Sequence, residues 1–207
     1  MRISEEIAEQ LRDDIISGVY KPRERLTEIE LSKKYNVSRT PIREAIKHLE
    51  AGGLIKVEPY HGAVIAELDV EEIKDIYEVR GILEGAAAQL AVSHVDESTL
   101  QKLEDSIEKM ERYARDKQNV LYAQENETFH RLIYNCCNNK VLVGVIDELM
   151  ERTALFRRLS FRSASNIKRA IAEHKSLVKA LRSGDAAKVQ KLSNEHVRLF
   201  LSREIMD

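Results

Sequence analysis

Apolar side chains recur every three to four residues along most of the chain, and this spacing is the period of an α-helix. Near the N-terminus, Ile7, Leu11 and Ile15 place apolar side chains on one face of a segment over about residues 4–17. Gly18 follows at once, and glycine is common just after a helix end. The pattern therefore predicts a first amphipathic helix that buries one face.

Two further helices follow a polar connection. Thr27 and Glu30 have the spacing of a capping box, in which a hydroxyl and a carboxylate satisfy free amides at the start of a helix. That helix ends before Asn36, which can turn the chain through a left-handed conformation. Ser38 is a favourable N-cap for the next helix, which stops at Gly52.

The apolar pattern then changes to two short runs, LIKVEP and AVIAEL, joined by the turn YHG. Short apolar runs that flank a glycine-containing turn are typical of a β-hairpin. Two helices with a short joint, followed by such a hairpin, predict a winged helix-turn-helix domain. We expect this domain to occupy residues 1–68.

The remainder of the chain contains helical patterns only. Amphipathic segments are separated by short polar turns, so the sequence predicts an all-α antiparallel bundle over residues 69–207. The fold class is therefore mainly α, with the winged domain first. The helical segments are about 69–92, 96–117, 119–137, 140–161, 165–183 and 185–204.

Composition sets limits on function. The 207 residues are 43% apolar and 33% charged, which is ordinary for a globular protein. No apolar run approaches the roughly 18 residues that cross a bilayer, and the charged start differs from a signal peptide, so we expect a cytoplasmic protein. The formal net charge of -2 provides no global basic field. Any contact with nucleic acid therefore depends on the local placement of lysines and arginines.

The third helix carries cations at its N-terminal end. A recognition helix enters the major groove of DNA by this end, where arginine can fork onto a guanine or onto phosphate oxygens. The alternative is that Arg39 and Arg43 are solvated charges, with Arg43 paired to Glu44. In the hairpin turn, glycine lets the backbone approach a sugar-phosphate wall, although a plain hairpin turn also favours glycine. The predicted DNA contacts are Ser38, Arg39, Thr40, Arg43, His61 and Gly62.

The segment LSKKYNVSRTPIREAIKHLEAGGLI resembles the DNA-binding domain of the GntR family of bacterial transcription regulators, and the resemblance covers about residues 4–66. It implies that the recognition-helix and wing residues named above contact the operator. One position departs from the family pattern. Ile29 stands where the best-studied members have an arginine in the second helix.

Three histidines fall on inward faces of the predicted bundle. His174 lies eleven residues before Asp185, the N-cap of the last helix, and His196 lies eleven residues after it. At ~1.5 Å per residue, both imidazoles stand ~16 Å from the turn of an antiparallel helix pair and face the same interior. Asn126 precedes His130 by one helical turn, so these two side chains share a face as well.

Three imidazoles and an amide oxygen that converge in a bundle core would hold a divalent metal with open coordination positions. Each histidine taken alone is better explained as a hydrogen-bonded core residue, and it is the matched depth that favours the metal. Arg80 also faces inward, and a buried arginine needs an anionic partner. Glu84, one turn on, could be a structural partner, and a bound organic acid is the other candidate. The apolar positions around Arg80 are Ile73, Ile76, Leu83, Ala87 and Leu90.

The bundle resembles the FCD domain, the ligand-binding half of FadR-like members of the GntR family, in the segments NETFH, EHKSLVKALRSGD and NEHV. The resemblance implies that Arg80 lines an effector pocket, and six helices resemble the VanR-type subgroup. Asn126 takes the place of the usual aspartate, and a neutral amide is a weaker donor, so metal affinity is lower or an anionic effector completes the shell. The implied ligands of a divalent ion such as zinc, nickel or manganese are Asn126, His130, His174 and His196.

These features predict a metabolite-responsive transcription regulator that acts as a homodimer. The winged domain would bind a short palindromic operator in double-stranded DNA, and the bundle would sense a small organic acid together with a divalent metal. The alternative from another class is a metal-dependent lyase or hydrolase acting on a small acid. Such an enzyme needs a base beside the metal, and the sequence contains no HExxH motif. Repression and activation both remain open at this point.

Overall fold

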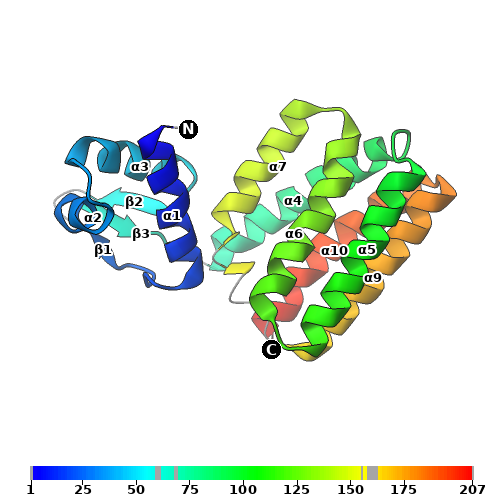
Figure 1. Cartoon of the computed structure of the whole chain (residues 1–207). Coiled ribbons are helices and arrows are strands. Elements are labelled where there is room, and N and C mark those ends of the chain that lie inside the picture. Colours follow the sequence, from blue (N-terminus) through cyan, green and yellow to red (C-terminus); the bar gives the residue numbers. More distant parts are fainter. Residues whose placement is uncertain (1, 59–61, 68–69, 155, 158–162, 207) are drawn as a thin grey trace. The chain divides into compact units, whose positions relative to one another are not determined.

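The computed structural model describes residues 2–58, 62–67, 70–154, 156–157 and 163–206 (Figure 1). The backbone separates into two compact units. Residues 1–69 with 151–155 form one unit, and residues 70–150 with 156–207 form the other. Among the described helices, none combines the length and the apolar character needed to cross a membrane.

The first unit packs three helices with a small antiparallel sheet (Figure 1). Its elements are α1 (Ile3–Ser17), β1 (Arg25–Leu26), α2 (Glu28–Tyr35), α3 (Arg39–Ala51), β2 (Ile55–Glu58) and β3 (Gly62–Ile65). The strand order is β1-β3-β2, and Val64 of β3 pairs with Arg25 on one side and with Lys56 on the other. The inward side chains of α1 and α3, Leu11 and Ile42 among them, are fully buried and form the core of this unit.

Local signals end these helices as predicted. Gly18 and Asn36 adopt left-handed conformations, with φ of 77° and 53°, at the ends of α1 and α2. At the start of α2, the Thr27 hydroxyl oxygen accepts a hydrogen bond from the backbone N of Glu30 at 3.2 Å. The Glu30 carboxylate accepts from the Thr27 hydroxyl at 2.6 Å, so only the first half of the predicted capping box forms. The sequence pattern does not predict β1, because a strand of two residues is too short to show alternation.

The second unit is a bundle of helices joined by tight turns (Figure 1). Its elements are α4 (Val70–Ala91), α5 (Glu97–Arg115), α6 (Asn119–Tyr134), the 3-10 turn η1 (Asn135–Cys137), α7 (Lys140–Arg152), α9 (Ala164–Ser183) and α10 (Ala186–Met206). Helix α10 packs along α4, and α5 packs against both α6 and α9. Gly184 ends α9 with φ of 71°, and Asp185 Oδ1 accepts from the backbone N of Lys188 at 3.0 Å. The predicted pairing of the last two helices therefore forms.

The fourth predicted segment of the bundle is wrong in length. Helix α7 ends at Arg152, Thr153 is a turn, and helical backbone resumes at Ala154, so residues 140–161 do not form one helix. The apolar spacing continues across this break, and periodicity alone therefore cannot reveal it. The comparison with the VanR-type subgroup stays a prediction, because residues 155 and 158–162 lie outside the described residues.

The inward face of α4 is wider than predicted and is rotated around the helix, because Tyr77, Gly81 and Ala88 are also buried. Ile73, Ile76 and Ala87 are buried, whereas Leu90 is 45% exposed. Successive residues turn by about 100° around a helix, so Leu90 lies about 100° from Ile73. It stands at the edge of the buried face rather than within it.

Candidate nucleic-acid interface and metal centre

The predicted recognition helix is α3, and its two faces differ in character. Ile42, Ala45 and Leu49 are buried in the first unit. Ser38 has the extended conformation of an N-cap residue, with φ of -69° and ψ of 168°. The start of α3 therefore presents two arginines and two hydroxyls to the outside. The predicted contact residues that are exposed at this end are Ser38, Arg39, Thr40 and Arg43.

Arg43 is paired with a residue from another helix. Its Nε and Nη2 atoms donate hydrogen bonds to the two carboxylate oxygens of Glu28, the first residue of α2, each at 2.9 Å. The hydrogen bonds from Arg43 lower the pKa of Glu28. The Arg43 side chain remains 62% exposed, so the pair lies at the surface. Sequence reasoning expected Glu44 as the alternative partner and missed Glu28, because this contact joins two helices.

The wing is described only in part. His61 lies outside the described residues, whereas Gly62 begins β3 with φ of 77°. A Cβ added at Gly62 would have nothing within 4 Å, so the backbone conformation rather than packing favours glycine there. Ile29 is 49% exposed on α2. At the position where the resemblance implies an arginine, α2 therefore offers an apolar side chain.

Three helices of the bundle each direct one histidine into its core. His130 of α6, His174 of α9 and His196 of α10 are 6%, 0% and 8% exposed. One ring nitrogen of each lies within 4.8 Å of the other two, and the Nε2 atoms of His174 and His196 are 3.2 Å apart. Two nitrogens that bind one ion at about 2.0–2.1 Å with tetrahedral angles stand roughly 3.3 Å apart. The three imidazoles therefore fit a shared divalent ion.

The outer nitrogens of two of these rings have partners of their own. His196 Nδ1 lies 2.8 Å from Glu173 Oε2, and His130 Nδ1 lies 3.2 Å from the Tyr134 hydroxyl. Both contacts use Nδ1 and leave Nε2 for the centre of the cluster. Burial lowers the pKa of His130 and of His174 well below the usual value, so both rings are neutral, as metal ligands must be.

Asn126 and Arg80 line the same small cavity as His130 and His196. Arg80 is 5% exposed, and its Nε donates to Glu84 Oε1 at 2.8 Å, so the structural pair that the sequence left open is formed. The cavity has a volume of about 30 Å³, which is roughly the space of one water molecule. An organic acid can therefore enter only if side chains around the cavity move.

Glu84 also joins this arginine to the histidine cluster. Its other carboxylate oxygen accepts a hydrogen bond from the Tyr134 hydroxyl, which contacts His130. Arg157, whose side chain is 12% exposed, brings a second guanidinium to the cavity lining. Sequence reasoning missed Tyr134 and Glu173, although Tyr134 lies one helical turn after His130. Arg157 follows the break after α7, so no continuous helical pattern could place it.

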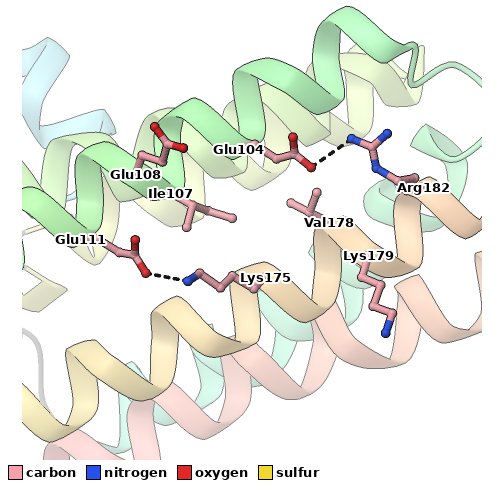
Figure 2. A pocket seen from close by; sticks show the side chains of 8 residues that line it. All are labelled: Glu104, Ile107, Glu108, Glu111, Lys175, Val178, Lys179 and Arg182. Carbon is pink, nitrogen blue, oxygen red and sulfur yellow. Dashed lines mark hydrogen bonds and ion pairs between the residues drawn. The ribbon is translucent and has the colours of Figure 1, made fainter.

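A larger hollow of about 470 Å³ lies between α5 and α9 (Figure 2). Lys175 Nζ donates to Glu111 Oε1 at 2.6 Å, and Arg182 Nη2 donates to Glu104 Oε1 at 2.9 Å. Opposite charges on the two helices therefore bridge this hollow. It is a solvated seam between helices, and such exposed pairs contribute little to stability.

Two family models match the chain. The model of the bacterial regulatory proteins of the gntR family matches residues 3–65, and the model of the FCD domain matches residues 75–199. These two matches coincide with the winged helix-turn-helix and with most of the bundle.

Similar proteins include two curated bacterial regulators. The uncharacterized HTH-type transcriptional regulator YdhC of Bacillus subtilis is 29% identical over 200 residues, covering 93% of this chain and 89% of YdhC. The HTH-type transcriptional repressor RspR of Escherichia coli is 26% identical over 196 residues, covering 95% of this chain and 86% of RspR. Among solved structures, E. coli McbR/YncC superposes on this chain with a TM-score of 0.87 at 21% sequence identity. The match covers 100% of this chain and 98% of the McbR/YncC chain, and it supports the fold.

Proposed function

The chain belongs to the gntR family of bacterial regulatory proteins and carries an FCD domain, and we propose that it is a ligand-controlled repressor that acts as a homodimer. Its family and its similar proteins are transcription regulators, so the alternative of a metal-dependent lyase or hydrolase is not retained. Repression is inferred from the similar protein RspR, which is named a repressor. In this proposal residues 1–68 bind operator DNA and residues 69–207 sense a small organic acid.

DNA binding is assigned to the start of α3 and to the wing. The exposed arginines and hydroxyls at the N-terminus of α3 support this assignment, because a helix N-terminus and its cations favour phosphate and guanine acceptors. The left-handed Gly62 supports a wing tip that approaches the DNA backbone closely. The proposed contacts are Ser38, Arg39, Thr40, Arg43, His61 and Gly62.

One observation carries the sensing half of the proposal: three imidazoles and an arginine lie around one buried site. His130, His174 and His196 would hold a divalent ion such as zinc, nickel or manganese, and Asn126 would add an amide oxygen. The ion would supply positive charge and an open coordination position. Because these four ligands are neutral, the ion would keep its positive charge, and a carboxylate that binds it could also pair with Arg80 if Glu84 moves.

Binding of the acid would have to change the packing around Arg80. The cavity has room for about one water molecule, and Glu84 already accepts a hydrogen bond from the guanidinium. Both residues lie on α4, the bundle helix nearest in sequence to the DNA-binding unit. We propose that the acid shifts α4 and thereby the spacing of the two recognition helices in a dimer. A coupling of about 1 to 3 kcal/mol would change operator affinity roughly 5- to 150-fold.

Two bundle variants test the sensing site. Protein purified without chelator should contain a divalent metal, and a thermal-shift screen of small mono-, di- and hydroxycarboxylic acids should identify a stabilising ligand. By calorimetric titration, His174→Ala should lose metal and acid binding together, because it removes a buried ligand. Arg80→Ala should keep the metal and lose the acid. A native protein that contains no metal and takes up neither zinc, nickel nor manganese would contradict the proposal.

One recognition-helix variant tests DNA binding. The wild-type protein should enrich a common site from a library of random duplex DNA. Arg43→Ala should bind that site roughly 5- to 150-fold more weakly in a gel-shift titration at fixed salt, because a forked contact to a guanine is lost. Equal affinity of both proteins for the enriched site would remove Arg43 from the interface.

A further inference from the structure

The ion pair between Glu28 and Arg43 joins the two helices of the helix-turn-helix at its outer surface. Glu28 is the first residue of α2, and Arg43 lies in the second turn of α3. The two hydrogen bonds are of equal length, 2.9 Å, and the two side chains are 32% and 62% exposed. A carboxylate is thus held at the surface that the proposed function turns towards DNA.

The choice of donor atoms matters for what Arg43 can still bind. A guanidinium has five N–H donors in one plane. Glu28 engages the side edge, formed by Nε and one hydrogen of Nη2. The far edge, formed by Nη1 and the second hydrogen of Nη2, is not used by this pair. Two parallel donors at that edge match the O6 and N7 acceptors that guanine presents in the major groove.

We propose that Glu28 is a positioning residue for sequence recognition, which holds the guanidinium of Arg43 in one plane so that its far edge reads a guanine. This inference rests on the proposed function, because it requires that α3 enters the major groove. A long arginine side chain that is not held can turn to phosphates or to other bases, and it loses rotamer freedom when it binds. A guanidinium that Glu28 holds has already lost its rotamer freedom before DNA binds. Its far edge can therefore bind only a base that presents acceptors in the matching geometry.

The carboxylate of Glu28 is negatively charged, and the effect of this charge on DNA binding distinguishes a positioning role from a purely structural one. A negative charge near the phosphate backbone weakens binding to DNA of any sequence. Glu28 therefore should lower non-specific affinity while it raises discrimination between bases. A residue that only stabilised the fold of α2 against α3 would change neither quantity once the variant is folded.

Selection from random duplex DNA with full-length protein tests this inference. We expect Glu28→Gln and Glu28→Ala to lose preference for a guanine at one position of each half-site, by about 5- to 150-fold, the discrimination of one forked contact. Their affinity for non-enriched duplex DNA at fixed salt should rise, because a negative charge near the phosphates is removed. Glu44→Gln is the matched control, because it removes an exposed carboxylate from α3 next to Arg43. It should keep the preference.

A double-mutant cycle completes the experiment. In an Arg43→Ala background, Glu28→Gln should cause no further loss of preference, because the residue that it positions is absent. Circular dichroism and the unfolding midpoint confirm that each variant is folded, and the Gln variant keeps the shape of Glu28 if the Ala variant unfolds. Unchanged base preference in folded Glu28 variants overturns the inference. Tighter binding of these variants to every DNA sequence, with unchanged base preference, also overturns the inference. In that case Glu28 would only compete with DNA for Arg43. If the wild-type protein enriches no site, the proposed function fails and the inference fails with it.

Discussion

Glu173 is the single residue that bears most directly on how the histidine cluster would bind a metal. Its carboxylate lies 2.8 Å from Nδ1 of His196. A carboxylate at the outer nitrogen of a ligating histidine fixes the tautomer and raises the basicity of the inner nitrogen. The charge of Glu173 matters more in this site, because Asn126 would offer the ion a neutral oxygen in place of the usual aspartate carboxylate. Glu173 supplies negative charge one step outside the proposed metal shell.

We therefore predict that Glu173→Gln weakens metal binding by about 10- to 100-fold, the usual effect of losing such an outer partner. Competition with a chromophoric chelator, using zinc, nickel and manganese in turn, measures the change. Glu104→Gln is a suitable control, since it removes a carboxylate from an exposed ion pair on α5. Equal metal affinity in the Glu173 and Glu104 variants would show that the contact with His196 has no such role.

At the scale of secondary-structure elements, α6 and α9 each bury an imidazole with a pKa far below its usual value. Burial is the largest cause for both rings, because the low-dielectric core disfavours the charged form. In the metal-free protein these helices therefore pack around neutral rings. An unfolded chain exposes the same rings to water, where they titrate near pH 6.5.

The sign of the resulting pH dependence follows from proton uptake. Below about pH 6.5 the unfolded state binds protons at His130 and His174, whereas the folded state does not, so the stability of the bundle falls as pH falls. We predict a loss of about 1.4 kcal/mol per pH unit for each ring between pH 6 and pH 5 in the presence of a chelator. Urea unfolding across this range measures it. His130→Asn should reduce the slope contributed by the two rings by about half, and an unchanged slope would contradict the assignment.

At the scale of the whole molecule, one winged helix-turn-helix contacts too few base pairs for useful selectivity. Two copies related by a two-fold axis would read two half-sites about one helical turn apart. We therefore predict a dimer in sedimentation velocity at micromolar concentration and a symmetric footprint on an inverted repeat. A monomer in solution that protects a single half-site would contradict the homodimer.

Residue spacing predicts most of the helices, the residues that end them and the shared depth of His174 and His196. Gly18, Asn36 and Gly184 end helices in left-handed conformations, as their residue types predict. His174 and His196 meet because each lies eleven residues from Asp185. These features depend on spacing along one helix or across one tight turn. Such local geometry is regular, and a pattern of residues is therefore sufficient to predict it.

The side chains that contact the candidate ligands, and the space around those ligands, follow from the packing of whole helices. Glu28 reaches Arg43 from another helix, Glu173 reaches His196 across the α9–α10 pair, and Glu84 links Arg80 to Tyr134. Glu28 and Glu173 occupy ordinary polar positions of a helix in the sequence, and the sequence indicates Glu84 only as a partner of Arg80, not of Tyr134. Contacts between helices depend on the rotation and separation of whole elements, which a one-dimensional period does not specify. The break after α7 and the small volume of the cavity follow from the same packing, because they depend on how neighbouring helices fill the core.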